Sequence, residues 1–146
     1  MVQKYPQAIR DSITEKRESI LHIAFASKQI AFVKKVVGFL TDEDLERINV
    51  EGNTGLCFAA KIGTVSIAKE MVKKNNRLPL IRSSREGSTP LHIAALFRYK
   101  EMMSYLFSVT SFEGLSPCER FAIFVATISN DMYGMLHISI NVSLST

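Results

Sequence analysis

Ser88-Thr89-Pro90-Leu91-His92-Ile93-Ala94-Ala95 has the features of a helix start. Thr89 suits the N-cap position, where its hydroxyl accepts a hydrogen bond from a backbone N–H of the first turn. Pro90 then takes the first helical position, where a missing N–H costs no hydrogen bond and the fixed φ suits the helix. Leu91 and the two alanines fall on one face, and the alanines keep that face thin enough for a second helix to approach.

The same pattern occurs three times along the chain, because related stretches lie at 18–25 and 53–60. Leu21, Leu56 and Leu91 hold equivalent places 35 residues apart. A fixed internal period in this range is typical of stacked repeats, in which each unit buries its apolar face against its neighbours. We therefore predict an all-α solenoid of stacked helix-turn-helix units, with about three full repeats and degenerate ends.

The second helix expected in each repeat also has recurring apolar positions. Four of them, spaced i, i+1, i+4 and i+5, coincide at a shift of 35 residues. A single stripe of this kind would be ordinary core packing, but its recurrence in register predicts helix pairs that share one core. The four sets are Phe32, Ile67 and Met102; Val33, Ala68 and Met103; Val36, Met71 and Leu106; and Val37, Val72 and Phe107.

The helix boundaries follow from these stripes and from the turn residues between them. The expected pairs are 20–27 with 30–40, 56–62 with 65–74, and 91–97 with 100–108. Gly63, between two helices, suits the left-handed conformation that ends a helix. Gly52 and Gly87 end the polar loops between repeats, and they predict turns with positive φ.

The chain divides into four parts on this reading. Residues 1–18 are expected to be a partial or fraying N-terminal segment, and residues 19–112 form the three repeats. Residues 113–130 are interpreted as a degenerate C-terminal repeat that covers the third, and residues 131–146 as a poorly determined tail. Within the degenerate repeat, Ser116 is the expected N-cap, Pro117 the first helical residue and Glu119 the partner that completes a capping box.

These motifs resemble those of the ankyrin-repeat family, whose signature is T-P-L-H-x-A. Residues 52–60, 78–82, 89–97 and 104–106 are similar to plant ankyrin-repeat proteins of the PGG-domain, membrane-anchored group. Members of that group carry further N-terminal repeats and a C-terminal membrane region, so the resemblance implies that this chain is a truncated form or fragment. It also implies that the imidazoles of His22 and His92 bind the Thr and the backbone of their turn.

Composition and charge exclude several classes of partner. The net charge of +4 is modest, and the lysine pairs at 34–35 and 73–74 do not form a basic face with aromatic residues, so we expect no nucleic acid partner. Two cysteines without metal-ligand spacing argue against a zinc site and fit a reducing compartment. With no secretory signal and no apolar run long enough for a bilayer, we predict a cytoplasmic protein, or one at the cytoplasmic face of a membrane.

The sequence gives little support to an enzyme. His22 and His92 recur with the repeat and so belong to the architecture, while Cys57 holds the equivalent place in the second repeat. No Gly-rich phosphate loop is present, and residues 42–44 lack the spacing of a calcium loop. We predict no catalytic residues, no cofactor and no bound metal.

The predicted function is a non-catalytic protein–protein interaction module, and the resemblance adds plant stress or defence signalling as its setting. The alternative is a truncated regulatory form of a membrane-anchored ankyrin protein that associates with its full-length homologue or with the membrane surface. Solenoids bind partners through the surface that their successive loops and first helices form. The candidate contact residues are the polar residues of two loop tips, Arg47, Asn49, Glu51, Arg82, Ser84 and Glu86.

Overall fold

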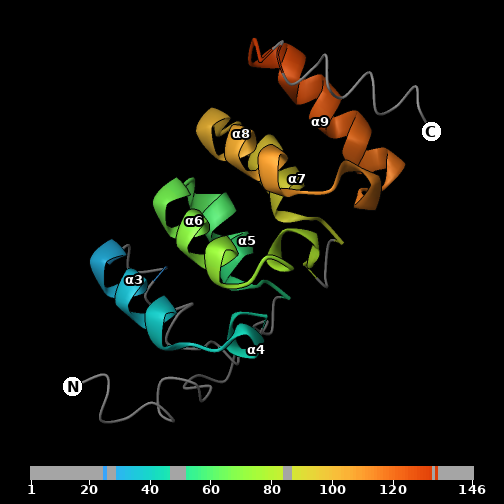
Figure 1. Cartoon of the computed structure of the whole chain (residues 1–146). Coiled ribbons are helices and arrows are strands. Elements are labelled where there is room, and N and C mark those ends of the chain that lie inside the picture. Colours follow the sequence, from blue (N-terminus) through green and yellow to red (C-terminus); the bar gives the residue numbers. More distant parts are fainter. Residues whose placement is uncertain (1–24, 26–28, 47–51, 84–86, 133, 135–146) are drawn as a thin grey trace.

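The computed structural model describes residues 25, 29–46, 52–83, 87–132 and 134. In this part of the chain all the regular structure is helical, which confirms the predicted fold class, and the helices follow one another in a staircase from α3 to α9 (Figure 1). The α-helices are α3 (Ile30–Phe39), α4 (Asp42–Leu45), α5 (Gly55–Ile62), α6 (Val65–Lys74), α7 (Pro90–Leu96), α8 (Lys100–Val109) and α9 (Pro117–Ser129), and the 3₁₀ turns are η2 (Leu78–Leu80) and η3 (Phe112–Gly114).

The helices form two rows. In the first-helix row, α5 packs against α7 and α7 against α9, and in the second-helix row α6 packs against both α3 and α8. Contacts of α5 with α6 and of α7 with α8 join the rows into pairs. The arrangement is the stack of helix pairs that the 35-residue period predicts.

Each helix of the first-helix row begins in the predicted way. The hydroxyls of Thr54, Thr89 and Ser116 each accept a hydrogen bond from the backbone N–H three residues later. Pro90 and Pro117 occupy first helical positions, and the reciprocal bond from Glu119 completes the capping box of α9. The fully described helices with predicted bounds, α3, α5, α6, α7 and α8, start and end within one residue of those bounds.

The turns also confirm the glycine predictions. Gly52, Gly63 and Gly87 have φ values of 81°, 82° and 65°. Gly63 ends α5 in the left-handed conformation, and a Cβ atom added there would lie 2.8 Å from the ring of Tyr99. Arg98 takes the corresponding place after α7 with a φ of 60°, which a residue other than glycine adopts only at some energetic cost.

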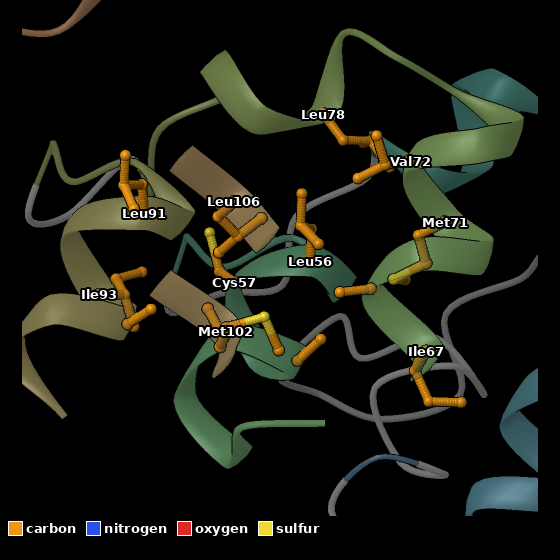
Figure 2. Close-up of a cluster of buried hydrophobic side chains, with 14 of the residues drawn as sticks. Leu56, Cys57, Ile67, Met71, Val72, Leu78, Leu91, Ile93, Met102 and Leu106 are labelled. Atoms are coloured by element: carbon orange, nitrogen blue, oxygen red, sulfur yellow. The ribbon is translucent and has the colours of Figure 1, made fainter. Parts of the chain in front are cut away.

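One apolar core runs through the stack. Side chains from α5, α6, α7 and α8 and from η2 meet in it (Figure 2). Leu56 and Leu91, which define the repeat, are 0% and 1% exposed. Of the four recurring sets in the second helices, every member is buried except Phe32 and Phe107, which are half-buried against the same core.

Some predictions fall on residues that the structure does not describe. These include the segment 1–18, most of the first predicted helix at 20–27 with Leu21 and His22, and most of the tail at 131–146. Phe25, at the end of the first repeat's signature stretch, is described, and its side chain is buried in the common core.

Candidate functional site

The structure describes one of the six predicted contact residues. Arg47, Asn49, Glu51, Ser84 and Glu86 lie outside the described residues, so their contact role stays a prediction. The remaining one, Arg82, precedes α7 in the loop of the third repeat.

Arg82 is used within the chain. Its Nη2 atom donates to the carbonyl oxygen of Gly114, at 2.8 Å, and to a carboxylate oxygen of Glu119, at 2.9 Å. Its side chain is 36% exposed. The guanidinium therefore joins the third repeat to the start of α9, whatever part it also takes in binding a partner.

Glu119 is the centre of this connection, and its side chain is only 3% exposed. One carboxylate oxygen accepts from the backbone N–H of Thr89 at 2.8 Å, and the other accepts from the N–H of Ser116 at 2.9 Å and from Arg82. Burial by itself raises the pKa of Glu119, but these N–H donors and the guanidinium outweigh it and lower the pKa to about 2. The carboxylate is thus ionised throughout the physiological range.

Sequence reasoning identified Glu119 as a capping residue but missed its bonds to the third repeat. Those bonds join residues 30 and 37 positions apart, a separation at which no local pattern predicts a contact. One available signal was that Glu119 occupies the place of Cys57 and His92, three residues after the N-cap, which is a partly or wholly buried position in the other repeats.

Two of the residues considered for catalysis are described: His92 lies in the first turn of α7, and Cys57 lies in the apolar core. The backbone N–H of His92 donates to the Thr89 hydroxyl at 3.3 Å. The Nδ1 atom of the His92 ring is buried and has no hydrogen-bond partner in the described structure. The ring contact with the turn that the resemblance implies is therefore not found for this nitrogen. Cys57 is 1% exposed in the core. No group of three or more His, Cys, Asp or Glu side chains in the described ranges is arranged to hold a metal ion.

A cleft of about 350 Å³ lies between the end of α7 and the exposed side of α9. The large apolar side chains along it are strongly exposed: Leu96 at 60%, Phe121 at 69% and Val125 at 43%. Its other lining residues are the small Ala95, Ala122 and Ala126 and the polar Arg98, Ser129 and Asn130. The cleft combines an apolar surface with one cationic group, and the sequence analysis did not anticipate it.

Within the described residues, no helix has both the length and the apolar character needed to cross a lipid bilayer.

Comparison with known proteins agrees with this geometry. A family model for ankyrin repeats in three copies matches residues 21–114, and the ankyrin repeat-containing protein ITN1 of Arabidopsis thaliana is 29% identical over 90 residues. That alignment covers 62% of this chain and 14% of the Arabidopsis protein, so this chain spans a small part of its relative's length. The PGG-domain subgroup stays a prediction. Because the family model covers well over half of the sequence and the capped, stacked helix pairs lie within it, the chain belongs to the ankyrin-repeat family.

Proposed function

We propose that this chain is a non-catalytic protein-binding module. Ankyrin repeats generally mediate protein–protein interaction, and the observation that carries the proposal is the repeated stack of capped helix pairs. Such a stack presents successive loops and first helices side by side, which makes an extended surface for a partner. We also propose that the module acts in the cytoplasm, in plant stress or defence signalling, a setting in line with its similarity to a plant protein.

The proposed contacts are the polar loop tips, with Arg47, Asn49 and Glu51 in one loop and Arg82, Ser84 and Glu86 in the next. Arg47 and Arg82 hold equivalent places, 35 residues apart. Arg82 is a poor choice for a charge-reversal test, because Arg82→Glu would set a second carboxylate against the buried Glu119. Loss of binding by that variant would be confounded with loss of stability.

Arg47→Glu is the better test. Partners captured by proximity labelling in plant cells with the wild-type chain should be lost or strongly depleted with this variant. Lys34→Glu, which makes the same charge change at an exposed site on α3, should retain them. Circular dichroism spectra and melting temperatures of both variants would verify folding. Full capture by a folded Arg47→Glu variant would show that the loop tips are not the binding surface.

The second candidate is a truncated regulatory form of a membrane-anchored ankyrin protein that associates with its full-length homologue or with the membrane surface. It is motivated by the motifs at 52–60, 78–82, 89–97 and 104–106, which resemble those of membrane-anchored plant ankyrin-repeat proteins. Membrane fractionation of this chain, expressed with and without a full-length homologue, tests it. Recovery in the membrane fraction only when the homologue is present would favour this role, and recovery in the supernatant in both cases would exclude it.

A further inference from the structure

We propose that the cleft between α7 and α9 binds an amphipathic helix of a partner protein, with the apolar face of that helix in the cleft and one of its carboxylates at Arg98. This inference rests on the proposed binding function and assigns a second contact surface and the chemistry of its partner. We call this surface the α7–α9 cleft; its lining residues are those given above.

The apolar side chains of the α7–α9 cleft lie where they can contact a ligand. Leu96 comes from α7, and Phe121 and Val125 lie one turn apart on α9. The lining also includes three alanines, Ala95, Ala122 and Ala126, whose small side chains leave room for another helix to approach closely. Large exposed apolar side chains around a hollow mark binding sites on soluble proteins, and a groove between two helices is a common receptor for an amphipathic helix.

The position of Phe121 distinguishes α9 from the preceding helices of its row. Five residues after the N-cap, α5 and α7 carry Ala59 and Ala94, which are completely buried, whereas α9 carries an aromatic ring that is 69% exposed. The alanines permit close stacking of neighbouring helices. The larger side chain of a phenylalanine would keep a neighbouring helix at a greater distance. This face of α9 therefore does not suit a further repeat packed as α9 packs on α7. The ring instead provides an apolar wall for a ligand that lies in the cleft.

Arg98 supplies the charge complementarity. Its side chain is exposed at the cleft, and the described structure gives its guanidinium no hydrogen bond or ion pair. No carboxylate is present among the described lining residues, and the nearby Asp131 lines a different hollow together with Lys69 and Lys100. A cation beside an apolar surface favours a ligand that combines apolar groups with a carboxylate.

Residues 135–146 contain no Asp or Glu. Their side chains therefore offer Arg98 no carboxylate. The proposed occupant is a separate protein segment in which apolar residues recur at helical spacing and an acidic residue lies at one end.

The experiment is a selection of random 14-residue peptides displayed on phage, performed on the complete chain with counter-selection on its Phe121→Ser variant. Peptides that survive should share apolar residues at i, i+3 or i+4, and i+7, together with an Asp or Glu. A selection that enriches no peptide on the wild type over the variant, or enriches peptides without an acidic residue, would overturn the proposal.

The best selected peptide, labelled with fluorescein, then tests each part of the cleft by fluorescence anisotropy. Phe121→Ser and Val125→Ser should each weaken binding about tenfold, as loss of a buried apolar contact does. Arg98→Asn, which removes the charge and tolerates the left-handed backbone, should weaken it about fivefold, while Arg98→Lys keeps most of the affinity. A matched peptide with amide in place of carboxylate should lose about the same factor on the wild type and nothing on Arg98→Asn. If the amide peptide also lost affinity for the Arg98→Asn variant, the two changes would act independently. That result would contradict the pairing of the peptide carboxylate with Arg98.

Two further measurements distinguish the α7–α9 cleft from the loop tips and from a dimer interface. Arg47→Glu should bind the selected peptide like the wild type, so the cleft can stand even if the loop-tip proposal fails; loss of peptide binding by that variant would refute a separate site. Light scattering after size-exclusion chromatography should report a monomer for wild type and Phe121→Ser alike. A wild-type dimer that Phe121→Ser dissolves would identify a second copy as the occupant and overturn the proposal.

Discussion

Glu119 shows how one buried charge can stabilise a terminal helix. It caps the first turn of α9, and it also binds the N-terminus of α7 and the guanidinium of Arg82. A buried carboxylate destabilises a protein when its hydrogen bonds are unmade, but this one accepts three together, from the N–H groups of Thr89 and Ser116 and from Arg82. The folded protein therefore favours the ionised form of Glu119 over the protonated form.

The lowered pKa of Glu119 predicts a defined dependence of stability on pH. The folded-state pKa of about 2 lies below the ordinary value of 4.5, so the carboxylate's contribution is complete above about pH 5 and is lost as the pH falls toward 2. Glu119→Gln should lower the free energy of unfolding by roughly 2–4 kcal/mol at pH 7. Urea unfolding at pH 7 and pH 3 measures both effects. A difference between wild type and variant that stays the same at both pH values would contradict the assignment.

Gly63 provides a second test at the scale of one residue. Gly63→Ala should destabilise the protein by at least roughly 1–2 kcal/mol, since φ is 82° and the new Cβ meets the Tyr99 ring at 2.8 Å. Gly38→Ala is the matched control within α3, because its Cβ meets nothing within 4 Å and its φ is not positive, so it should stabilise by roughly 0.5–1 kcal/mol. Thermal melts of the two variants should shift in opposite directions.

Among the helices, α7 has the most constrained surroundings, because it packs against α5, α8 and α9. Its Ala94 and Ala95 are 0% and 6% exposed, while Leu96 at its end is 60% exposed. Small residues on the packed faces set how closely the neighbouring helices approach. The small residues of α7 are therefore buried against its neighbours, and its large exposed residue Leu96 lines the α7–α9 cleft.

Ala94→Leu should destabilise the protein by roughly 1–3 kcal/mol, because the larger side chain has no room among the packed helices. Lys61→Leu is the control, because it also introduces a leucine but at an exposed site near the end of α5. It should change the free energy of unfolding by less than about 0.5 kcal/mol. Chemical denaturation of both variants provides the comparison. Equal stabilities would mean that Ala94 does not lie in a packed seam.

Across the whole molecule, polar contacts reinforce the apolar stack between neighbours. Lys74 donates to the carbonyl oxygens of Val37 and Gly38 at the end of α3, and the buried Asn75 donates to Asp42 and Glu46 of the α4 region. At the other end, Arg82 and Glu119 connect the third repeat to α9. Each connection spans one interface, in keeping with a solenoid whose units touch only adjacent units.

Such a solenoid should open locally when one connection is lost. Asn75→Ala should increase hydrogen exchange in α3 and α4 while leaving α9 protected, because Asn75 loses its bonds to Asp42 and Glu46. Glu119→Gln should have the opposite pattern, with faster exchange in α9 and little change in α3. Hydrogen exchange with mass spectrometry resolves these peptides. A uniform increase over all helices in both variants would indicate a single cooperative unit instead.

Local signals in this sequence were sufficient to predict α3, α5, α6, α7, α8 and the start of α9. A Thr or Ser cap, a proline at the first position and an apolar stripe in register act within a few residues, so Thr89, Pro90 and the recurring sets from Phe32 to Phe107 predicted where helices begin and which faces are buried. The glycines at 52, 63 and 87 predicted their turns for the same reason, since the low energetic cost of a positive φ is a property of glycine itself.

The contacts between distant residues depended on the stacking of the units. The contact of Arg82 with a partner protein stays a prediction, but its bond to Glu119 could not be predicted, because only the packing of α9 on α7 brings the two residues together. The α7–α9 cleft has the same origin: Leu96, Phe121 and Arg98 are ordinary surface residues until two helices set them around one hollow. Charge and apolar surface at such long sequence separation are organised by three-dimensional packing, which no short-range pattern encodes.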